Sequence, residues 1–289
     1  MKNKAPLKLG LTMWSHSPWQ QSLFGPGTKP SERLEKYARF FNTVEGNTTF
    51  YATPSVSTVK NWSAATPGDF SFTFKLPKNI THSGNLRTKR TELYAFLSIM
   101  EPVMEKIGLW TIQLPASFSP EHLSDLQTFV RYFPQSASLA IEVRHQHFFS
   151  KGPEEKAFNA WLIDKNLDRI IMDSRPIFSV SPTGPLLADA QKKKPKVPVH
   201  AISTANHPLI RFIGLPSPAD NTDFIQPWIG KLSDWMSRGK IPYLMVHTAN
   251  NDYAPELAMA FYDTLCKQCQ MPERAVLLNE NHQPQMTMF

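Results

Sequence analysis

Residues 40–54, FFNTVEGNTTFYATP, hold the pattern that decides the fold. The apolar start around Val44 predicts a strand, and Pro54 opens a predicted helix. Because side chains alternate across a strand, Glu45 and Asn47 share one face, opposite to Val44. The carboxyl end of a strand, just before a helix, is where α/β barrels keep their catalytic residues. Glu45 and Asn47 are therefore our first candidate site residues.

Eight segments of the chain have this strand-like character, and most are followed by a helix-like segment. They are residues 7–14, 40–47, 70–76, 109–114, 139–144, 169–174, 209–214 and 243–248. Strands that alternate with helices predict a parallel sheet, and eight such units predict closure into a barrel. We therefore predict an α/β fold, a TIM-like (β/α)8 barrel of parallel strands, as one domain over residues 1–289. A doubly wound open sheet is the alternative, but no G-x-G-x-x-G pattern follows the first strand.

Apolar residues recur at helical spacing in four of the intervening segments, residues 93–100, 123–130, 224–236 and 257–265. Ser119 and Pro120 predict the start of the second of these helices, as an N-cap followed by proline. Pro102 is expected to end or kink the first helix.

One connection, residues 175–208, is long and rich in proline. It leaves the end of the sixth predicted strand, so in a barrel it begins over the active face. Only residues 186–194 have a helical pattern, and a basic run occupies residues 192–196. A loop of this length inside a compact domain is usually functional or disordered. The lysines could bind phosphate groups, but we favour a solvated loop.

The composition favours an anionic partner, and the apolar runs predict no membrane-spanning segment. The chain has 31 lysines and arginines against 24 aspartates and glutamates, a formal net charge of +7. Such a charge favours a small anionic ligand or nucleic acid as partner, although a basic enzyme without such a partner is equally compatible. The N-terminal apolar run is too short for a signal peptide, and no later run is long enough to span a membrane.

The two cysteines, Cys266 and Cys269, provide no disulfide framework, so a reducing cytoplasm is the expected location. Their C-x-x-C spacing falls in or at the end of the last predicted helix, whereas reactive pairs lie at helix N-termini. We therefore expect no redox role for this pair.

Polar and apolar side chains alternate along the predicted strands. In the third strand, for example, Phe72 and Phe74 oppose Thr73 and Lys75. We expect the apolar set to pack against the helices and the polar set to line the barrel interior. The polar residues predicted to meet at the carboxyl-terminal mouth are Thr12, Glu45, Asn47, Lys75, Gln113, Glu142, Arg144, Asp173, Arg175, Arg211 and His247. Trp14, after the first strand, is a further candidate for lining the site.

Charges gathered in a partly desolvated mouth must be paired or shift their pKa values. Paired charges build a rigid anion site, whereas a spare carboxylate becomes a general acid or base. The residues expected to hold an anion are Lys75, Arg144, Arg175 and Arg211. The residues expected to act in proton transfer are Glu45 or Glu142, His82, and Asp173 as an orienting group. The alternative is that the carboxylates only form barrel-filling ion pairs with the arginines.

A divalent metal is an open alternative for a cofactor. Carboxylates at strand ends near His82, His145 or His247 would offer oxygen and imidazole ligands. No ligand-spaced motif such as H-E-x-x-H occurs, so the sequence does not identify a cofactor.

Several strings along nearly the whole chain resemble those of the YecE-like family of domains of unknown function. They are VEGNTTFYATP (44–54), F-K-x-P (74–77), ITH (80–82), QLPASF (113–118), EVRH (142–145), DSRP (173–176), KKKPKVPVHA (192–201), LIRFIG (209–214) and HTANND (247–252). The resemblance implies a TIM-like barrel and no particular activity. It also implies family motif positions at Glu45, Asn47, Thr49, Tyr51, Lys75, Thr81, His82, Gln113, Glu142, Arg144, His145, Asp173, Ser174, Arg211 and Gly214. The stretch from His247 differs from the Asn-rich residues often found in the wider family.

We expect an enzyme of the hydrolase, isomerase or lyase type that applies acid–base chemistry to a small anionic substrate, phosphorylated or sugar-containing. Further residues expected to bind this substrate are Asn47, Tyr51, Gln113, His247 and Trp14. Nucleic-acid binding, as in a nuclease-like phosphodiesterase barrel, is the alternative suggested by the net charge and the lysine run. A binding or scaffold role without chemistry is the third.

Overall fold

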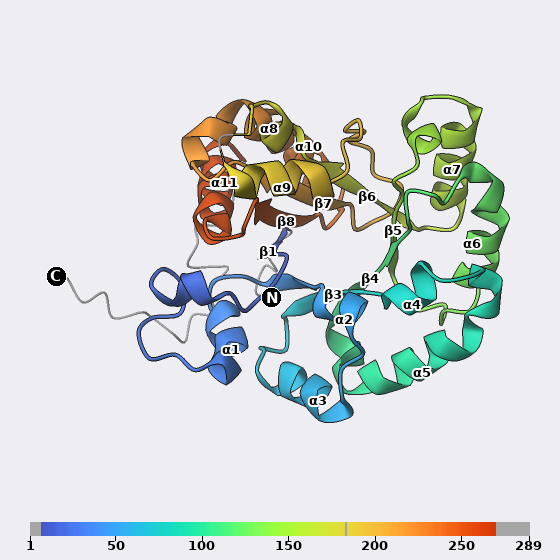
Figure 1. Ribbon diagram of the computed structural model, residues 1–289, viewed down its shortest axis with the longest axis horizontal. Coiled ribbons are helices and arrows are strands. Elements are labelled where there is room, and N and C mark those ends of the chain that lie inside the picture. Colours follow the sequence, from blue (N-terminus) through green and yellow to red (C-terminus); the bar gives the residue numbers. More distant parts are fainter. Residues whose placement is uncertain (1–6, 183, 270–289) are drawn as a thin grey trace.

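The computed structural model describes residues 7–182 and 184–269, which form a closed barrel of eight parallel strands (Figure 1). The strands are β1 (Lys8–Leu11), β2 (Thr43–Gly46), β3 (Ser71–Lys75), β4 (Ile107–Gln113), β5 (Leu139–Glu142), β6 (Asp168–Asp173), β7 (Leu209–Gly214) and β8 (Tyr243–Thr248). Sequence neighbours pair in parallel, and β8 pairs with β1 to close the barrel. The predicted TIM-like (β/α)8 fold is therefore confirmed. The single-domain prediction extends to residues 1–6, 183 and 270–289, which lie outside the described residues.

Helices connect the strands and surround the barrel in Figure 1. They are α1 (Arg33–Tyr37), α2 (Thr48–Tyr51), α3 (Val56–Ala64), α4 (Lys78–Thr81), α5 (Arg90–Met100), α6 (Leu123–Val130), α7 (Pro153–Asp164), α8 (Arg175–Phe178), α9 (Pro185–Lys193), α10 (Thr222–Ser237) and α11 (Ala254–Cys269). As Pro102 predicted, α5 ends at Met100, and a 3-10 turn follows over Glu101–Lys106. A second 3-10 turn, Pro120–His122, leads into α6.

Alternating side chains divide the core into an outer and an inner part. Outside the sheet, Phe72 stacks on Phe74 with ring centroids 5.1 Å apart, and Phe74 stacks on Trp62 of α3 at 5.4 Å. Gly46 of β2 leaves room for this aromatic layer, since a Cβ there would lie 2.3 Å from the Phe74 ring. Inside the barrel, a separate apolar layer is formed by Leu109, Ala140, Ile170, Leu209, Tyr243 and Met245. The charged residues of the mouth therefore stand on an apolar base.

The long segment after β6 folds back over the barrel mouth. Its helix α9 lies across the front of β7 and β8 in Figure 1, and matches the helical pattern predicted at residues 186–194 to within one residue. An apolar cluster joins this segment to the barrel, formed by Met172, Ile177, Ala190 and Ile213. The Ser174 hydroxyl adds a tie by donating to the backbone oxygen of Pro195 at 2.9 Å. The segment is thus packed against the strands whose ends carry the site.

Asp168, at the start of β6, is a buried carboxyl, 2% exposed. Its Oδ1 accepts the backbone N–H of His207 at 3.0 Å. Burial raises the pKa of Asp168 from 3.8 to about 7, against the opposing effects of that N–H and of Lys240. The folded protein therefore favours the protonated form of this side chain.

We predict that Asp168→Asn, which keeps the oxygen that accepts from His207, removes a pH dependence of stability. Because the pKa of Asp168 is higher in the folded than in the unfolded protein, protonation of this carboxyl stabilises the fold. That stabilisation is fully present below about pH 4 and is lost as the pH rises through about 7. From pH 4 to about 8, the free energy of unfolding of the unchanged protein should fall relative to the variant, by up to about 4 kcal/mol. Urea unfolding across this range measures the difference, and parallel curves for the two proteins would contradict the raised pKa.

Candidate functional site

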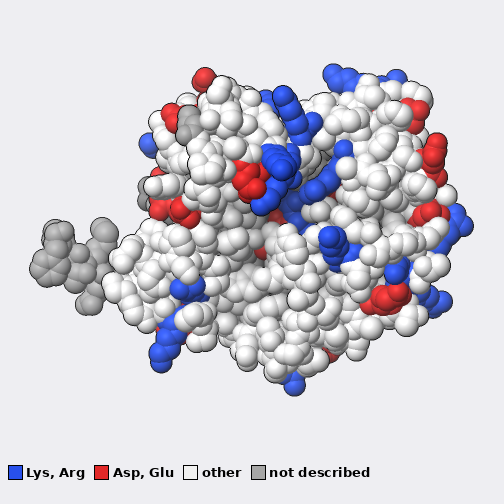
Figure 2. Space-filling view, viewed as in Figure 1, with Lys and Arg blue, Asp and Glu red and all other residues white. Residues whose placement is uncertain are grey.

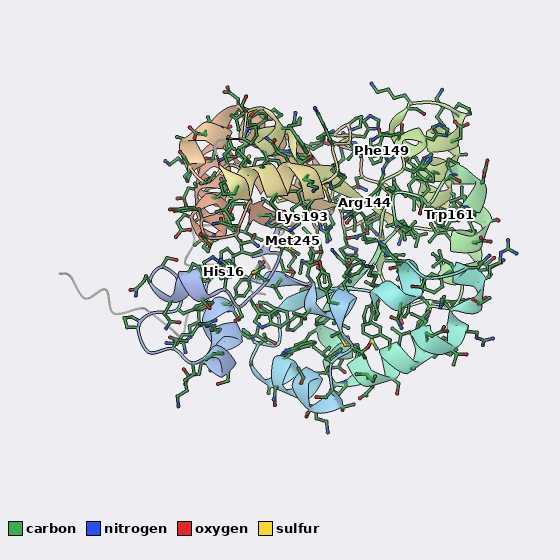
Figure 3. All side chains as sticks on the ribbon, viewed as in Figure 1. His16, Arg144, Phe149, Trp161, Lys193 and Met245 are labelled. Atoms are coloured by element: carbon green, nitrogen blue, oxygen red, sulfur yellow. The ribbon has the colours of Figure 1, made fainter. Side chains whose placement is uncertain are left out.

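A cavity of about 580 Å³ opens at the carboxyl ends of the strands. The cationic side chains that line it are Lys75, Lys78, Arg144, Lys193, Lys194 and Arg211. Figure 2 shows lysines and arginines gathered around a hollow near the centre of this face. Figure 3 places two of them, Lys193 and Arg144, near the middle of the same view, close to α9 and β5. The mouth of the barrel is therefore a basic cavity.

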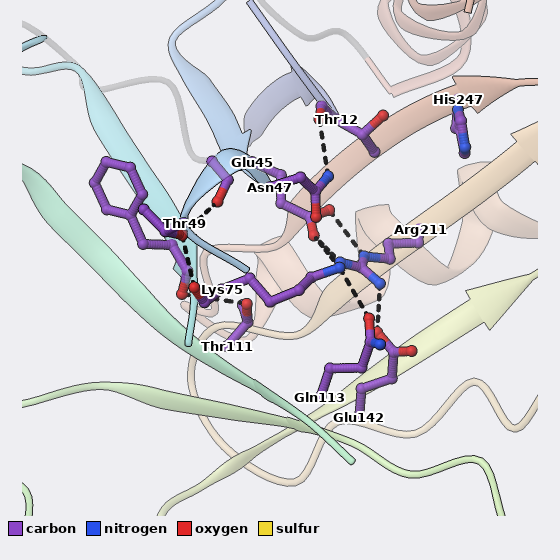
Figure 4. Close-up of polar contacts among 12 residues, drawn as sticks. Thr12, Glu45, Asn47, Thr49, Lys75, Thr111, Gln113, Glu142, Arg211 and His247 are labelled. Atoms are coloured by element: carbon purple, nitrogen blue, oxygen red, sulfur yellow. Dashed lines mark hydrogen bonds and ion pairs between the residues drawn. The ribbon is translucent and has the colours of Figure 1, made fainter. Parts of the chain in front are cut away.

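Arg211 of β7 lies on the floor of this cavity between two carboxylates (Figure 4). Its Nε donates to Oε2 of Glu45 on β2 at 2.8 Å, and its terminal nitrogens contact Glu45 and Glu142 of β5. All three side chains are buried, with residue exposures of 6% or less. The predicted convergence of opposite charges from separate strands is confirmed for these three residues.

Two further cations extend the same network. The Lys75 ammonium donates to Oε1 of Gln113 at 2.9 Å and lies 3.4 Å from Oε1 of Glu45. Arg144 Nε donates to Oε1 of Glu142 at 2.7 Å. Both carboxylates therefore face cations with each of their two oxygens, so this arrangement is a paired lattice.

Burial shifts two cations of this lattice, Lys75 and Arg211, toward their neutral forms. The pKa of Lys75 is lowered to about 8, chiefly by burial, with Glu142 raising it and Arg144 lowering it further. Burial likewise lowers the pKa of Arg211 to about 9, so its guanidinium remains charged at pH 7. The buried positive charges are therefore retained near neutral pH, but at an energetic cost that their carboxylate partners offset.

His247 of β8 and Lys194 also line the cavity. The Lys194 ammonium lies 2.5 Å from His247 Nε2, and His247 Nδ1 contacts Oδ1 of Asn251. Burial, followed by the Lys194 charge, lowers the pKa of His247 to about 3, so the imidazole is neutral at pH 7. Its Nδ1–H then donates to Asn251, and its Nε2 accepts from Lys194. His247 therefore holds Lys194 in the cavity.

Lys194 is one of three cavity-lining lysines that sequence reasoning missed, with Lys78 and Lys193. The prediction that the run at residues 192–196 is solvated is wrong for Lys194, because α9 packs on the barrel and turns this side chain inward. Burial lowers its pKa to about 8, followed by the nearby charges of Lys75 and Arg144. The signal was available: Lys194 shares one helical face with Leu187 and Ala190, both of which pack on the barrel.

His82 lies at the edge of the cavity, directly after α4. Its Nδ1 is 2.8 Å from the Thr81 hydroxyl, and its ring meets Phe50 edge-on with centroids 5.1 Å apart. Burial, followed by the charges of Arg144 and Lys78, lowers its pKa, so the ring is neutral near pH 7. His82 is therefore a half-buried imidazole with the properties of a base.

Asn47 and Tyr51 also line the cavity, as predicted. The Asn47 amide donates to the backbone oxygen of Thr12 at 2.8 Å, which ties the ends of β1 and β2 together. Tyr51 is 82% exposed and lies at the rim. Asn47 thus holds the cavity wall in place, whereas the Tyr51 side chain is exposed at the rim.

The inward orientation predicted for Asp173 is wrong. In β6, Ile170 joins the inner apolar layer and Met172 lines the cavity, so Asp173 points outward. There it accepts from the Trp228 indole N–H at 2.7 Å and from Arg175 Nε and a terminal nitrogen at 2.9 and 2.7 Å. The hydrogen bond between Trp228 and Asp173 joins α10 to the end of β6, outside the barrel. Arg175 accordingly does not line the cavity either.

Trp14 is likewise absent from the cavity lining, contrary to the prediction. It packs edge-on against Trp62 at 5.3 Å and Phe72 at 6.4 Å, in the outer aromatic layer. A large indole buries more apolar surface among these rings than it would at a charged mouth. Its neighbour Met13 lines the cavity instead.

The described residues offer no cluster of three or more histidine, cysteine, aspartate or glutamate side chains that could hold a metal ion. The carboxylates at the strand ends are engaged by arginine and lysine. Over residues 7–182 and 184–269, no helix is both long and apolar enough to cross a membrane.

Comparison with known proteins gives matches along nearly the whole chain. The profile of the family described as "Protein of unknown function DUF72" matches residues 8–282. UPF0759 protein YecE of Escherichia coli K12 is 42% identical over 259 residues, which cover 90% of this chain and 92% of that protein. A crystal structure of a DUF72 family protein from Enterococcus faecalis V583 has a TM-score of 0.68 at 22% identity, covering 90% of this chain and 95% of that one. A Thermotoga maritima DUF72 protein has a TM-score of 0.67 at 20% identity, covering 90% and 98%.

We predict that Arg211→Met lowers the free energy of unfolding by about 3–5 kcal/mol, because it leaves two buried carboxylates without their shared partner. Arg238→Met is the matched control, since Arg238 is 68% exposed and pairs with Asp234 one helical turn away. That variant should change stability by less than about 1 kcal/mol. Urea unfolding at pH 7 measures both, and equal small losses would show that the lattice has little structural importance.

Proposed function

This chain belongs to the DUF72 family of proteins of unknown function, as its motifs predicted, and we propose that it is an enzyme for a small anionic substrate, phosphorylated or sugar-containing. The observation that supports the proposal is the surplus of cations at the barrel mouth. Six cationic side chains line the cavity, whereas the acidic side chains paired with them in the described structure are Glu45, Glu142 and Asp189. A bound anion would compensate the remaining positive charge.

Lys75, Arg144 and Lys194 are the proposed ligands of the anion. Lys194 has its pKa lowered by burial and then by the charges of Lys75 and Arg144, so these cations repel one another. An anion placed among them stabilises their charged forms and raises the pKa of both lysines. Relief of this repulsion therefore favours the binding of an anion.

His82 is the proposed proton-transfer group. Its imidazole is neutral near pH 7 and lines the cavity, with Thr81 fixing Nδ1. If the Thr81 hydroxyl accepts from Nδ1–H, Nε2 has a lone pair with which to take a proton from a bound substrate. Glu45 and Glu142 are paired on both oxygens, so we assign them the task of holding Arg211 and its neighbours in place.

Nucleic-acid binding is the second candidate, and it also draws on the cluster of lysines and arginines. The cavity volume of about 580 Å³ is in the range of small-molecule sites, and α9 walls one side of it. This enclosure favours a small ligand over a polymer. Retention on single-stranded DNA or RNA with a steep dependence on salt would favour the polymer instead.

We predict that inorganic phosphate binds the protein and that Lys194→Met weakens binding by about tenfold or more, the effect of removing one charged hydrogen bond. Lys192→Met is the matched control, because Lys192 lies in the same basic run but is exposed and outside the cavity lining. It should bind phosphate like the unchanged protein. Isothermal titration calorimetry at fixed salt measures all three affinities.

The affinity for sulfate, whose charge is constant from pH 6 to 9, should fall as the pH rises through about 8, because Lys75 and Lys194 lose their protons there. An equal loss of phosphate affinity in the Lys192 and Lys194 variants would indicate diffuse attraction and contradict the proposed site. The absence of phosphate binding at low salt would contradict the proposed function itself.

A further inference from the structure

A second cavity, of about 410 Å³, lies beside the basic one. Its walls come from two of the sequence motifs, residues 80–82 and 113–118, and from the segment around Leu86. The lining residues used below are His82, Asn85, Leu86, Ser117, Phe118 and His122. His82 lines both cavities, so it stands at the boundary between them.

The chemistry of the second cavity differs from that of the first. Leu86 and Phe118 give it apolar walls, and Asn85 and Ser117 add neutral polar groups. Among the described residues its lining has no lysine or arginine, and its one carboxylate is Asp125. The Arg87 guanidinium donates to that carboxylate at 2.5 Å and compensates its charge. This cavity therefore suits an uncharged group with both apolar faces and hydroxyls.

We propose that the second cavity binds the sugar portion of a phosphorylated sugar whose phosphate occupies the basic cavity. The inference rests on the proposed function, because it requires the anion to lie among Lys75, Arg144 and Lys194. A sugar ring presents C–H faces that pack on an aromatic ring such as Phe118, and hydroxyls that pair with Ser117 and Asn85.

His82 is then the residue next to the junction of the two substrate portions. Its Nδ1 is held by Thr81 at 2.8 Å and its ring by Phe50, so its position is fixed between the cavities. A base at this point faces the carbon and oxygen atoms that join phosphate to sugar. The boundary position of His82 thus links the substrate class to the proton transfer proposed above.

The test measures affinities for inorganic phosphate and for a panel of pentose and hexose monophosphates by calorimetry. We expect at least one sugar phosphate to bind the unchanged protein tenfold or more tightly than phosphate does. Ser117→Trp, at an exposed position of the cavity lining, should abolish that gain and leave phosphate affinity unchanged. Ala116→Trp is the matched control, since Ala116 is exposed and is absent from both linings.

His122→Trp, from the turn before α6, is a second way to fill the cavity if the first variant is unstable. If phosphate binds but no sugar phosphate binds more tightly, or if both filling variants keep the gain, the sugar subsite is wrong while the anion site stands. If a cavity-filling variant weakens the binding of phosphate and of sugar phosphate by the same factor, the proposed subsite is also wrong. If phosphate does not bind at all, the proposed function and the subsite fail together.

Discussion

The ion pairs of Arg211 with Glu45 and Glu142 are the constraint on which the mouth of this barrel depends. They join β7 to β2 and β5 across the barrel interior, above an apolar layer that closes the strands' amino-terminal half. A guanidinium buried to this extent requires anionic partners, and each carboxylate in turn requires cations on both oxygens. The positions of Lys75 and Arg144 follow from that requirement, since they complete the pairing.

The same constraint explains why the cavity above the lattice is basic. Because Glu45 and Glu142 are already paired, additional cations at the rim have few acidic partners. Lys194 comes from the segment after β6 and reaches the cavity, and there its ammonium donates to the neutral imidazole of His247 on β8. The segment is therefore part of the site, and its apolar contacts through Ala190 and Ile177 determine where the lysine is placed. The proposed anionic ligand would balance this surplus of cations.

The sequence was sufficient for the fold and for most of the lattice, because period-two alternation is unambiguous where one face is aromatic or aliphatic. Phe72 and Phe74 decide the orientation of β3, and Lys75 follows from them. In β6 the run of Ile170, Ile171 and Met172 is apolar on both faces, so alternation cannot assign Asp173 a side. Its indole partner comes from a helix 55 residues away, which no local pattern reveals. Lys194 was missed although it shares a helical face with Leu187 and Ala190, because that pattern does not show where the long loop packs on the barrel.

A crystal of the protein soaked in selenate, a tetrahedral dianion like phosphate, gives the most direct measurement of the cavity's charge. Anomalous scattering at the selenium edge locates the anion without reference to the protein atoms. The charge surplus predicts a strong peak within hydrogen-bonding distance of at least two of Lys75, Arg144 and Lys194. A map with selenate only on the outer surface, and none at the barrel mouth, would contradict the anion site.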